Sequence, residues 1–242
     1  MLIHKWDAAA DPEEWRRWLG TTAPFGTLVV NNLDRDEAPL VVPTHAVLVG
    51  DALLVHLARP NPVWPHLEAA RKVRFVVVGD DAYVPSTWRA AASQPATDGV
   101  PTSYYAAVQL TCEPAVIDDP EAKAELLRAQ MRLVQPEGGT AAVAVGEAPF
   151  GGMLAGIRGV ELAIVEVAAK FKFDDHKPVE HRERVALHQP LVDVRARVAL
   201  VPVGDDERPS RLQRVGAREL PLGAGREAGA AAAAHVGGLD RL

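Results

Sequence analysis

Closely spaced apolar runs, joined by turn residues and interrupted by few helical segments, most constrain how this chain can fold. Gly50 and Asp51 form a two-residue turn signal between two such runs, which is typical of a β-hairpin. We therefore expect an antiparallel barrel or sandwich rather than a doubly wound parallel sheet. The predicted strands span residues 26–31, 39–49, 52–58, 73–79, 104–113 and 160–173.

Peripheral helices are predicted between some of these strands. Asp11 can cap a first helix, Pro12 suits its first position, and Glu14 completes an Asp-x-x-Glu variant of the capping box. Two further helices are predicted near residues 63–71 and at 119–134. The fold class is therefore mainly β with peripheral helices.

Composition and charge restrict the class of protein. Hydrophobic residues make up 48% of the chain and charged residues 24%, which is ordinary for a globular protein with a buried core. The formal net charge of −6 argues against nucleic acid as a dominant partner. The single cysteine, Cys112, excludes an intrachain disulfide framework and a Cys-rich zinc site. The N-terminus lacks a signal-peptide core and no run reaches membrane-spanning length, so we expect a cytoplasmic protein without membrane association.

The chain divides into a body, residues 1–185, and a tail, residues 186–242. No aromatic residue follows Phe173, and the tail is rich in Ala, Arg and Gly. Too few large apolar groups are available there to offset the entropy of ordering, so we expect the tail to be disordered. A GC-rich gene read in a shifted frame beyond Leu187 would produce the same composition, and this second interpretation stays open.

The stretch VHLARPNPVW, residues 55–64, combines a strand end with a rigid, polar and aromatic corner. Arg59 can bind a phosphate through two parallel hydrogen bonds, which Lys cannot reproduce. Asn61 can donate to and accept from the edge of a ring, and Trp64 offers a flat apolar face. The structural alternative is a proline-stiffened turn in which Asn61 bonds its own backbone and Trp64 enters the core.

The corner contains the second of five motifs that occur in order along the chain. These motifs are P-T-H, H-x-A-R-x-N-P-x-W, A-Y-V-x-S-x-W, V-P-T-x-x-Y-x-A-V and A-K-F-K-F. Together they resemble the PaiB-type FMN-binding proteins, often labelled negative transcriptional regulators. The resemblance covers about residues 1–185. It implies a split β-barrel like those of flavin reductases and pyridoxamine-phosphate oxidases, a homodimer, and FMN at the subunit interface. A nicotinamide cofactor would then deliver hydride to the flavin.

The sequence departs from the pattern of that family in three places. Ser103 stands where the family has Trp, and Arg89 stands where it has Tyr. The family's Ser-Gln-Asn after its strand motif is replaced by Asp174, Asp175 and His176. The first two changes affect the wall expected to stack on the flavin ring, and the third places two carboxylates in a loop expected to contact the cofactor.

The resemblance and the residue chemistry together predict a set of flavin contacts. Each also has an ordinary structural role: Pro43 in an edge strand, hydroxyls as turn formers, and cross-strand packing or a solvated lysine face in the strands. Asp174, Asp175, His176 and His181 lack metal-ligand spacing, so no metal is predicted. No catalytic acid, base or nucleophile is identified. The predicted cofactor-binding residues are Thr44, His45, Arg59, Asn61, Trp64, Ser86, Thr87, Trp88, Thr102, Tyr105 and Lys172.

Three functions remain open at this point. The first is an FMN-binding split-barrel protein with flavin-dependent redox activity, in which the flavin supplies the chemistry. The second is a transcriptional regulator that binds DNA or a partner protein, for which no helix-turn-helix pattern is found. The third is a dimeric barrel that has lost its flavin, because the loops at 102–105 and 172–176 are altered.

Overall fold

The computed structural model describes residues 1–188 except 23, 24 and 92. Contacts group Met1–Asp205 into one unit and Asp206–Leu242 into a second, which lies outside the described residues. The predicted tail, residues 186–242, lies almost entirely within 189–242. The predictions about it therefore fall outside the described residues.

One antiparallel sheet of seven strands forms the framework, in the order β2-β1-β5-β6-β7-β4-β3. The hairpin turn predicted at Gly50 and Asp51 is confirmed: it joins β3 to β4, and Gly50 adopts a φ of 56°. The run predicted as one strand over 39–49 is two strands that break at Ala46. The strands are β1 Phe25–Val30, β2 Leu40–His45, β3 Val47–Val49, β4 Ala52–Ala58, β5 Val73–Val84, β6 Thr102–Ile117 and β7 Ile157–Lys172.

The position of Ala46 forces the sheet to curl. This residue alone separates β2 from β3, yet these two strands are the opposite edges of the sheet. Their ends can lie one residue apart only if the sheet bends round on itself. Among the described strands the two edges are not hydrogen-bonded neighbours, so the predicted split β-barrel is confirmed.

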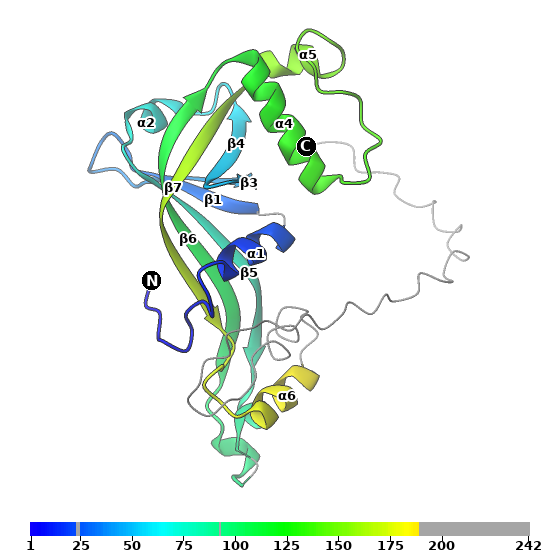
Figure 1. Ribbon diagram of the computed structural model, residues 1–242. Helices are drawn as coiled ribbons and strands as arrows, with labels where there is room; N and C mark the ends of the chain where they lie inside the picture. Colours follow the sequence, from blue (N-terminus) through cyan, green and yellow to red (C-terminus); the bar gives the residue numbers. More distant parts are fainter. Residues whose placement is uncertain (23–24, 92, 189–242) are drawn as a thin grey trace, which may run out of the picture. The chain divides into compact units, whose positions relative to one another are not determined.

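Short helices surround the sheet, and Figure 1 shows α2 and α4 near one end of the long strands and α6 near the other. The helix predicted at 119–134 is confirmed, with Asp119 accepting a hydrogen bond from the amide of Ala122 at 2.8 Å. At the first helix, the Glu14 carboxylate accepts from the amide of Ala10 at 2.5 Å, one residue before the predicted cap. The helices are α1 Glu14–Thr22, α2 Trp64–Ala69, α3 Ser86–Arg89, α4 Pro120–Val134, α5 Phe150–Met153 and α6 Val179–His188.

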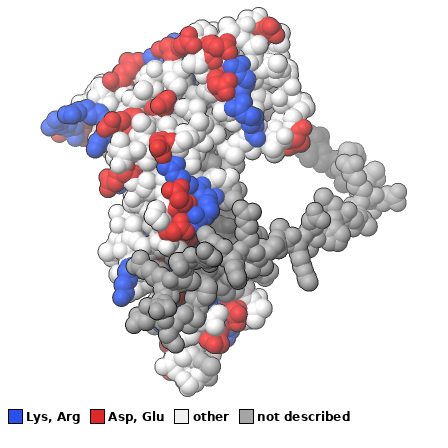
Figure 2. Space-filling view, in the orientation of Figure 1, with Lys and Arg blue, Asp and Glu red and all other residues white. Residues whose placement is uncertain are grey.

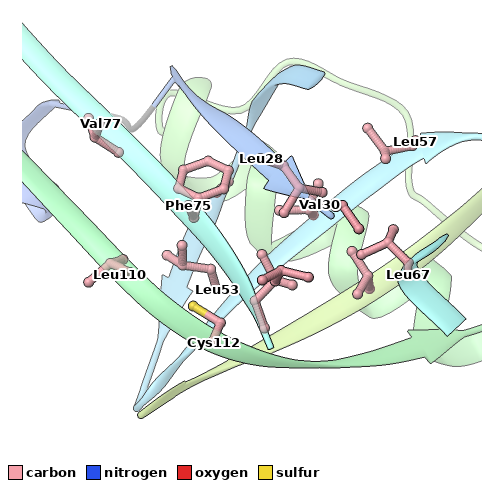
Figure 3. Close-up of a cluster of buried hydrophobic side chains, with 14 of the residues drawn as sticks. Leu28, Val30, Leu53, Leu57, Leu67, Phe75, Val77, Leu110 and Cys112 are labelled. Atoms are coloured by element: carbon pink, nitrogen blue, oxygen red, sulfur yellow. The ribbon is translucent and has the colours of Figure 1, made fainter. Parts of the chain in front are cut away.

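Two large hydrophobic clusters stabilise the described part of the chain, and a third of three buried residues (Ala124, Val143 and Leu154) lies at α4. The larger lies inside the curled sheet, where side chains of β1, β4, β5 and β6 point toward one another (Figure 3). Cys112 belongs to it, and burial raises the pKa of its thiol to about 12, which disfavours the nucleophilic thiolate. The smaller cluster packs Tyr104, Phe171, Phe173 and Val185 together and so docks α6 on the far end of β6 and β7.

Gly26 lets β1 approach β5 closely, which gives a stability prediction. A Cβ at this position would lie 2.4 Å from the Phe75 ring and 2.7 Å from the carbonyl oxygen of Val76. We expect Gly26→Ala to lower the free energy of unfolding by about 1–3 kcal/mol, because a packed core resists an inserted methyl group. Gly20→Ala is the matched control: Gly20 is exposed in α1 with nothing within 4 Å, so alanine should stabilise. Urea unfolding of both variants measures the difference, and effects of equal sign would contradict this interpretation.

Candidate functional site

The predicted flavin contacts do not gather at one place in a single chain. Ala58, which precedes the Pro-rich corner, pairs with Ile157 at the start of β7. Tyr105 pairs with Lys172 at the other end of that strand. At about 3.3 Å per residue, these two positions lie roughly 50 Å apart along β7. We call the residues around Arg59 the corner group and those around Lys172 the far-end group.

In the corner group (Arg59, Asn61 and Trp64), every predicted residue makes a contact inside the chain. Arg59 donates to the carbonyl of Ala155 at 2.9 Å and to the Asp118 carboxylate at 3.3 Å. The side-chain oxygen of Asn61 accepts from the amide of Val63 at 3.0 Å. Trp64 is only 3% exposed and its indole nitrogen donates to the carbonyl of Ala58 at 3.0 Å. These contacts explain the corner as a rigid turn, and its contact with a flavin stays a prediction.

Three of the predicted flavin contacts, Thr102, Tyr105 and Lys172, lie together in the far-end group, and their contact with a flavin stays a prediction. The Lys172 ammonium donates to the Thr102 hydroxyl at 2.7 Å and lies 5.9 Å from the centre of the Tyr105 ring. All three side chains are partly buried. A cation, a hydroxyl and a flat aromatic surface at one place match the groups that a flavin mononucleotide requires.

The neighbouring Lys170 does not lie on a solvated face, contrary to the ordinary expectation for that strand. It is 8% exposed, donates to the carbonyl of Leu2 at 3.0 Å and lies 3.7 Å from the Asp7 carboxylate. The N-terminal segment therefore covers Lys170, while Phe171 and Phe173 face the smaller cluster as the alternation predicted.

The hydroxyl and aromatic residues after β5 form the short helix α3. Thr87 is exposed and Ser86 is partly buried. Trp88 stacks on His188 of α6, with ring centres 5.0 Å apart and planes inclined by 19°. Its inner side packs against the smaller hydrophobic cluster. Trp88 therefore links α3 to α6, and the pairing of Val84 with Thr102 brings the start of α3 near the far-end group.

Thr44 and His45 lie at the end of β2. That strand is an edge of the sheet, so Pro43 costs no ladder bond, as the structural alternative predicts. His45 is exposed and meets the ring of Phe25 edge-on at 4.8 Å. Thr44 is partly buried, and its hydroxyl contacts the carbonyl of His45 at 3.4 Å.

Two of the departures from the family pattern contact each other. The Arg89 guanidinium donates two hydrogen bonds of 3.0 Å to the Asp174 carboxylate. The Tyr104 hydroxyl donates to the same carboxylate at 2.9 Å. Burial alone would raise the pKa of Asp174, but the Tyr104 bond and the Arg89 charge hold it below its ordinary value. This ion pair was not among the predicted contacts, although two opposite charges among the departures were the signal for it.

Asp175 behaves in the opposite way to its neighbour. Burial raises its pKa to about 7, with Asp7 and Asp174 adding to the shift and Arg182 opposing it. A raised carboxyl pKa means that this group stabilises the fold in acid and that the contribution falls as the pH rises toward 7. We expect Asp175→Asn to remove that loss, so that its unfolding free energy varies less between pH 5 and pH 8 than that of the unchanged protein. Urea unfolding across this range tests it, and identical pH profiles would contradict it.

Neither a metal centre nor a membrane span emerges from the described part of the chain. Within it, no group of three or more His, Cys, Asp or Glu side chains could hold a metal ion. Its helices are all too short or too polar to cross a bilayer.

The curled antiparallel sheet places the chain in the class of split-barrel proteins, and the cation, hydroxyl and aromatic ring of the far-end group are groups that can bind a flavin. Residues 1–166 match the family model described as "Putative FMN-binding domain", and the chain belongs to this family. A comparison with curated proteins finds no match.

Solved structures share the fold at low identity. One is the flavocytochrome Anf3 from Azotobacter vinelandii, with 19% identity, a TM-score of 0.53, and 71% of this chain and 72% of that chain covered. Another is a FAD and heme binding protein from Mycobacterium smegmatis, with 21% identity, a TM-score of 0.53, and 69% and 73% covered. A conserved hypothetical protein from Mycobacterium tuberculosis has 13% identity, a TM-score of 0.53, and 85% and 99% covered.

Proposed function

We propose that this protein is a PaiB-type flavin-dependent redox protein that binds FMN between two copies of the chain. The observation that carries the proposal is the separation of the corner group from the far-end group along β7. One flavin can meet both groups only if the corner group of one copy lies beside the far-end group of another. The predicted homodimer thus completes a site that a single chain leaves divided.

An exposed apolar surface supports the dimer. Phe25, Val41 and Val78 are 56%, 60% and 60% exposed, and they belong to the neighbouring strands β1, β2 and β5. Exposed apolar side chains grouped in this way commonly mark a surface that another chain covers. A second copy is the partner that the divided site requires.

The residues of the far-end group fit an FMN cofactor. Lys172 and Thr102 can hold an oxygen of the phosphate or ring, and Tyr105 can pack against a flat face. The two carboxylates of the altered loop need not repel the phosphate of FMN. Arg89 balances the charge of Asp174, and burial disfavours the ionised form of Asp175.

The cofactor and the protein would have different roles in the proposed reaction. Bound FMN would supply the hydride and electron chemistry. The chain's own residues would bind and orient the cofactor, and a nicotinamide cofactor is the proposed hydride donor.

Regulation through DNA gains no support from the charge of the molecule. Figure 2 shows Lys and Arg interspersed with Asp and Glu over the face in view, rather than one basic surface. A nucleic-acid interface normally needs a basic stripe or patch to neutralise phosphates.

An absorption spectrum of the purified protein, taken before and after FMN is added, tests the proposal. We expect about one FMN per chain, released by denaturation, because the protein positions the cofactor without a covalent bond. Sedimentation of the same sample should show a dimer. A colourless protein that takes up no FMN would favour the barrel that has lost its flavin, and a flavin-loaded monomer would overturn the shared site.

A further inference from the structure

A pocket of about 240 Å³ lies where α4 packs beside β4 and the end of β2. Its volume is below the roughly 300 Å³ at which sites for drug-sized ligands begin. The pocket is partly open to the surface, so a small molecule of matching size can enter it. The lining residues are His45, Ala46, His56, Leu127, Gln130, Met131, Leu133 and Val134.

The lining is apolar apart from two histidines and one amide. None of the described residues around the pocket is Lys, Arg, Asp or Glu. A charged ligand would therefore lose its hydration without gaining an ion pair, which is costly. The pocket favours a small neutral molecule with a largely apolar surface.

His56 provides the pocket with a hydrogen-bond acceptor. It alternates with the buried Val55 and Leu57 on β4, so it lies on the face that points away from the barrel core. Its Nδ1 lies 2.6 Å from Oε1 of Gln130, and Nε2 of Gln130 donates to the carbonyl of Leu54 at 3.4 Å. The amide oxygen can only accept, so the shared proton is on Nδ1 of His56. The other ring nitrogen, Nε2, is then a hydrogen-bond acceptor in the neutral imidazole.

We propose that this pocket binds a small neutral aromatic molecule with one hydroxyl donor, of the phenol class. The ring occupies the space between Leu127, Met131 and Val134, and the hydroxyl donates to Nε2 of His56. The pocket shares only His45 with the predicted flavin contacts, because β4 and α4 supply most of its lining. His45 belongs to both sets of residues, so a ligand in this pocket lies beside one predicted flavin contact.

Binding of p-cresol to the full chain, measured by isothermal titration with and without added FMN, tests the proposal. Saturable binding is expected in both cases, and toluene, which has the same ring and no hydroxyl, should bind about tenfold more weakly. Absence of saturable p-cresol binding, or equal affinities for p-cresol and toluene, would overturn it. Both comparisons use the unchanged protein, so they do not depend on whether a variant folds.

Two substitutions on α4 locate the binding. Leu127→Trp fills the pocket and should abolish p-cresol binding. Arg132→Trp adds the same side chain to an exposed position on the same helix and should leave the affinity unchanged. Binding that survives Leu127→Trp, or is lost equally in both variants, would show that p-cresol binds elsewhere.

Discussion

Replacing Arg89 by Met is expected to lower the free energy of unfolding by about 3–5 kcal/mol at pH 7, because it leaves a buried carboxylate without its cation. Asp174 is only 4% exposed and receives two hydrogen bonds of 3.0 Å from Arg89. The same guanidinium donates to the carbonyl of Val100 at 2.5 Å, so the loop before β6 loses a contact as well. Urea unfolding monitored by tryptophan fluorescence measures the loss.

A surface pair provides the matched control for Arg89. Arg17 donates to Asp11 at 2.6 Å and 3.0 Å, but both side chains are exposed to solvent. Arg17→Met should therefore change the unfolding free energy by less than about 1 kcal/mol. Equal effects of the two substitutions would show that burial of Asp174 does not decide the outcome.

The pH dependence of the Arg89 effect has a definite sign. The pKa of Asp174 is lowered in the folded protein, so its contribution to stability is present above the ordinary carboxyl pKa. That contribution is lost as the pH falls through the lowered folded value. The difference between the Arg89→Met variant and the unchanged protein should therefore shrink in acid, and a difference that grows would contradict this account.

Replacing Lys172 by Met is expected to weaken FMN binding about 10- to 100-fold, since it removes one charge-assisted hydrogen bond to the cofactor. Methionine keeps the length of the apolar stem beside Tyr105 and loses the ammonium that now bonds Thr102. Quenching of FMN fluorescence on titration with protein measures the affinity, and the unfolding midpoint shows whether the fold is retained.

Arg74 is the control for Lys172. It is an exposed cation on the same sheet and donates to Gln109 at 3.1 Å and to Thr111 at 3.3 Å. Arg74→Met should leave FMN affinity within about twofold of the original, because surface charges act weakly at a distance through salt. If both variants lose affinity equally, Lys172 contributes only to the general charge of the surface.

Local features of the sequence determined the elements of the fold. Alternating apolar runs specified the strands because side chains on a strand alternate between its faces, and Asp119 with Pro120 specified the start of α4. Pro43 has no amide to donate, so the structural alternative for this segment was an edge strand, and β2 is an edge. The five motifs in their order identified the FMN-binding family, because each motif is a short local stretch that can be recognised without the tertiary structure.

Only the tertiary structure decided how distant residues meet. Arg89 and Asp174 are 85 positions apart, and β5, β6 and β7 must pair before their side chains can form one ion pair. Nor could the sequence show that the corner group and the far-end group lie at opposite ends of β7, because motif order carries no distance. Local sequence specifies backbone preferences and turns, whereas the meeting of side chains depends on strand register and on the curl that Ala46 imposes.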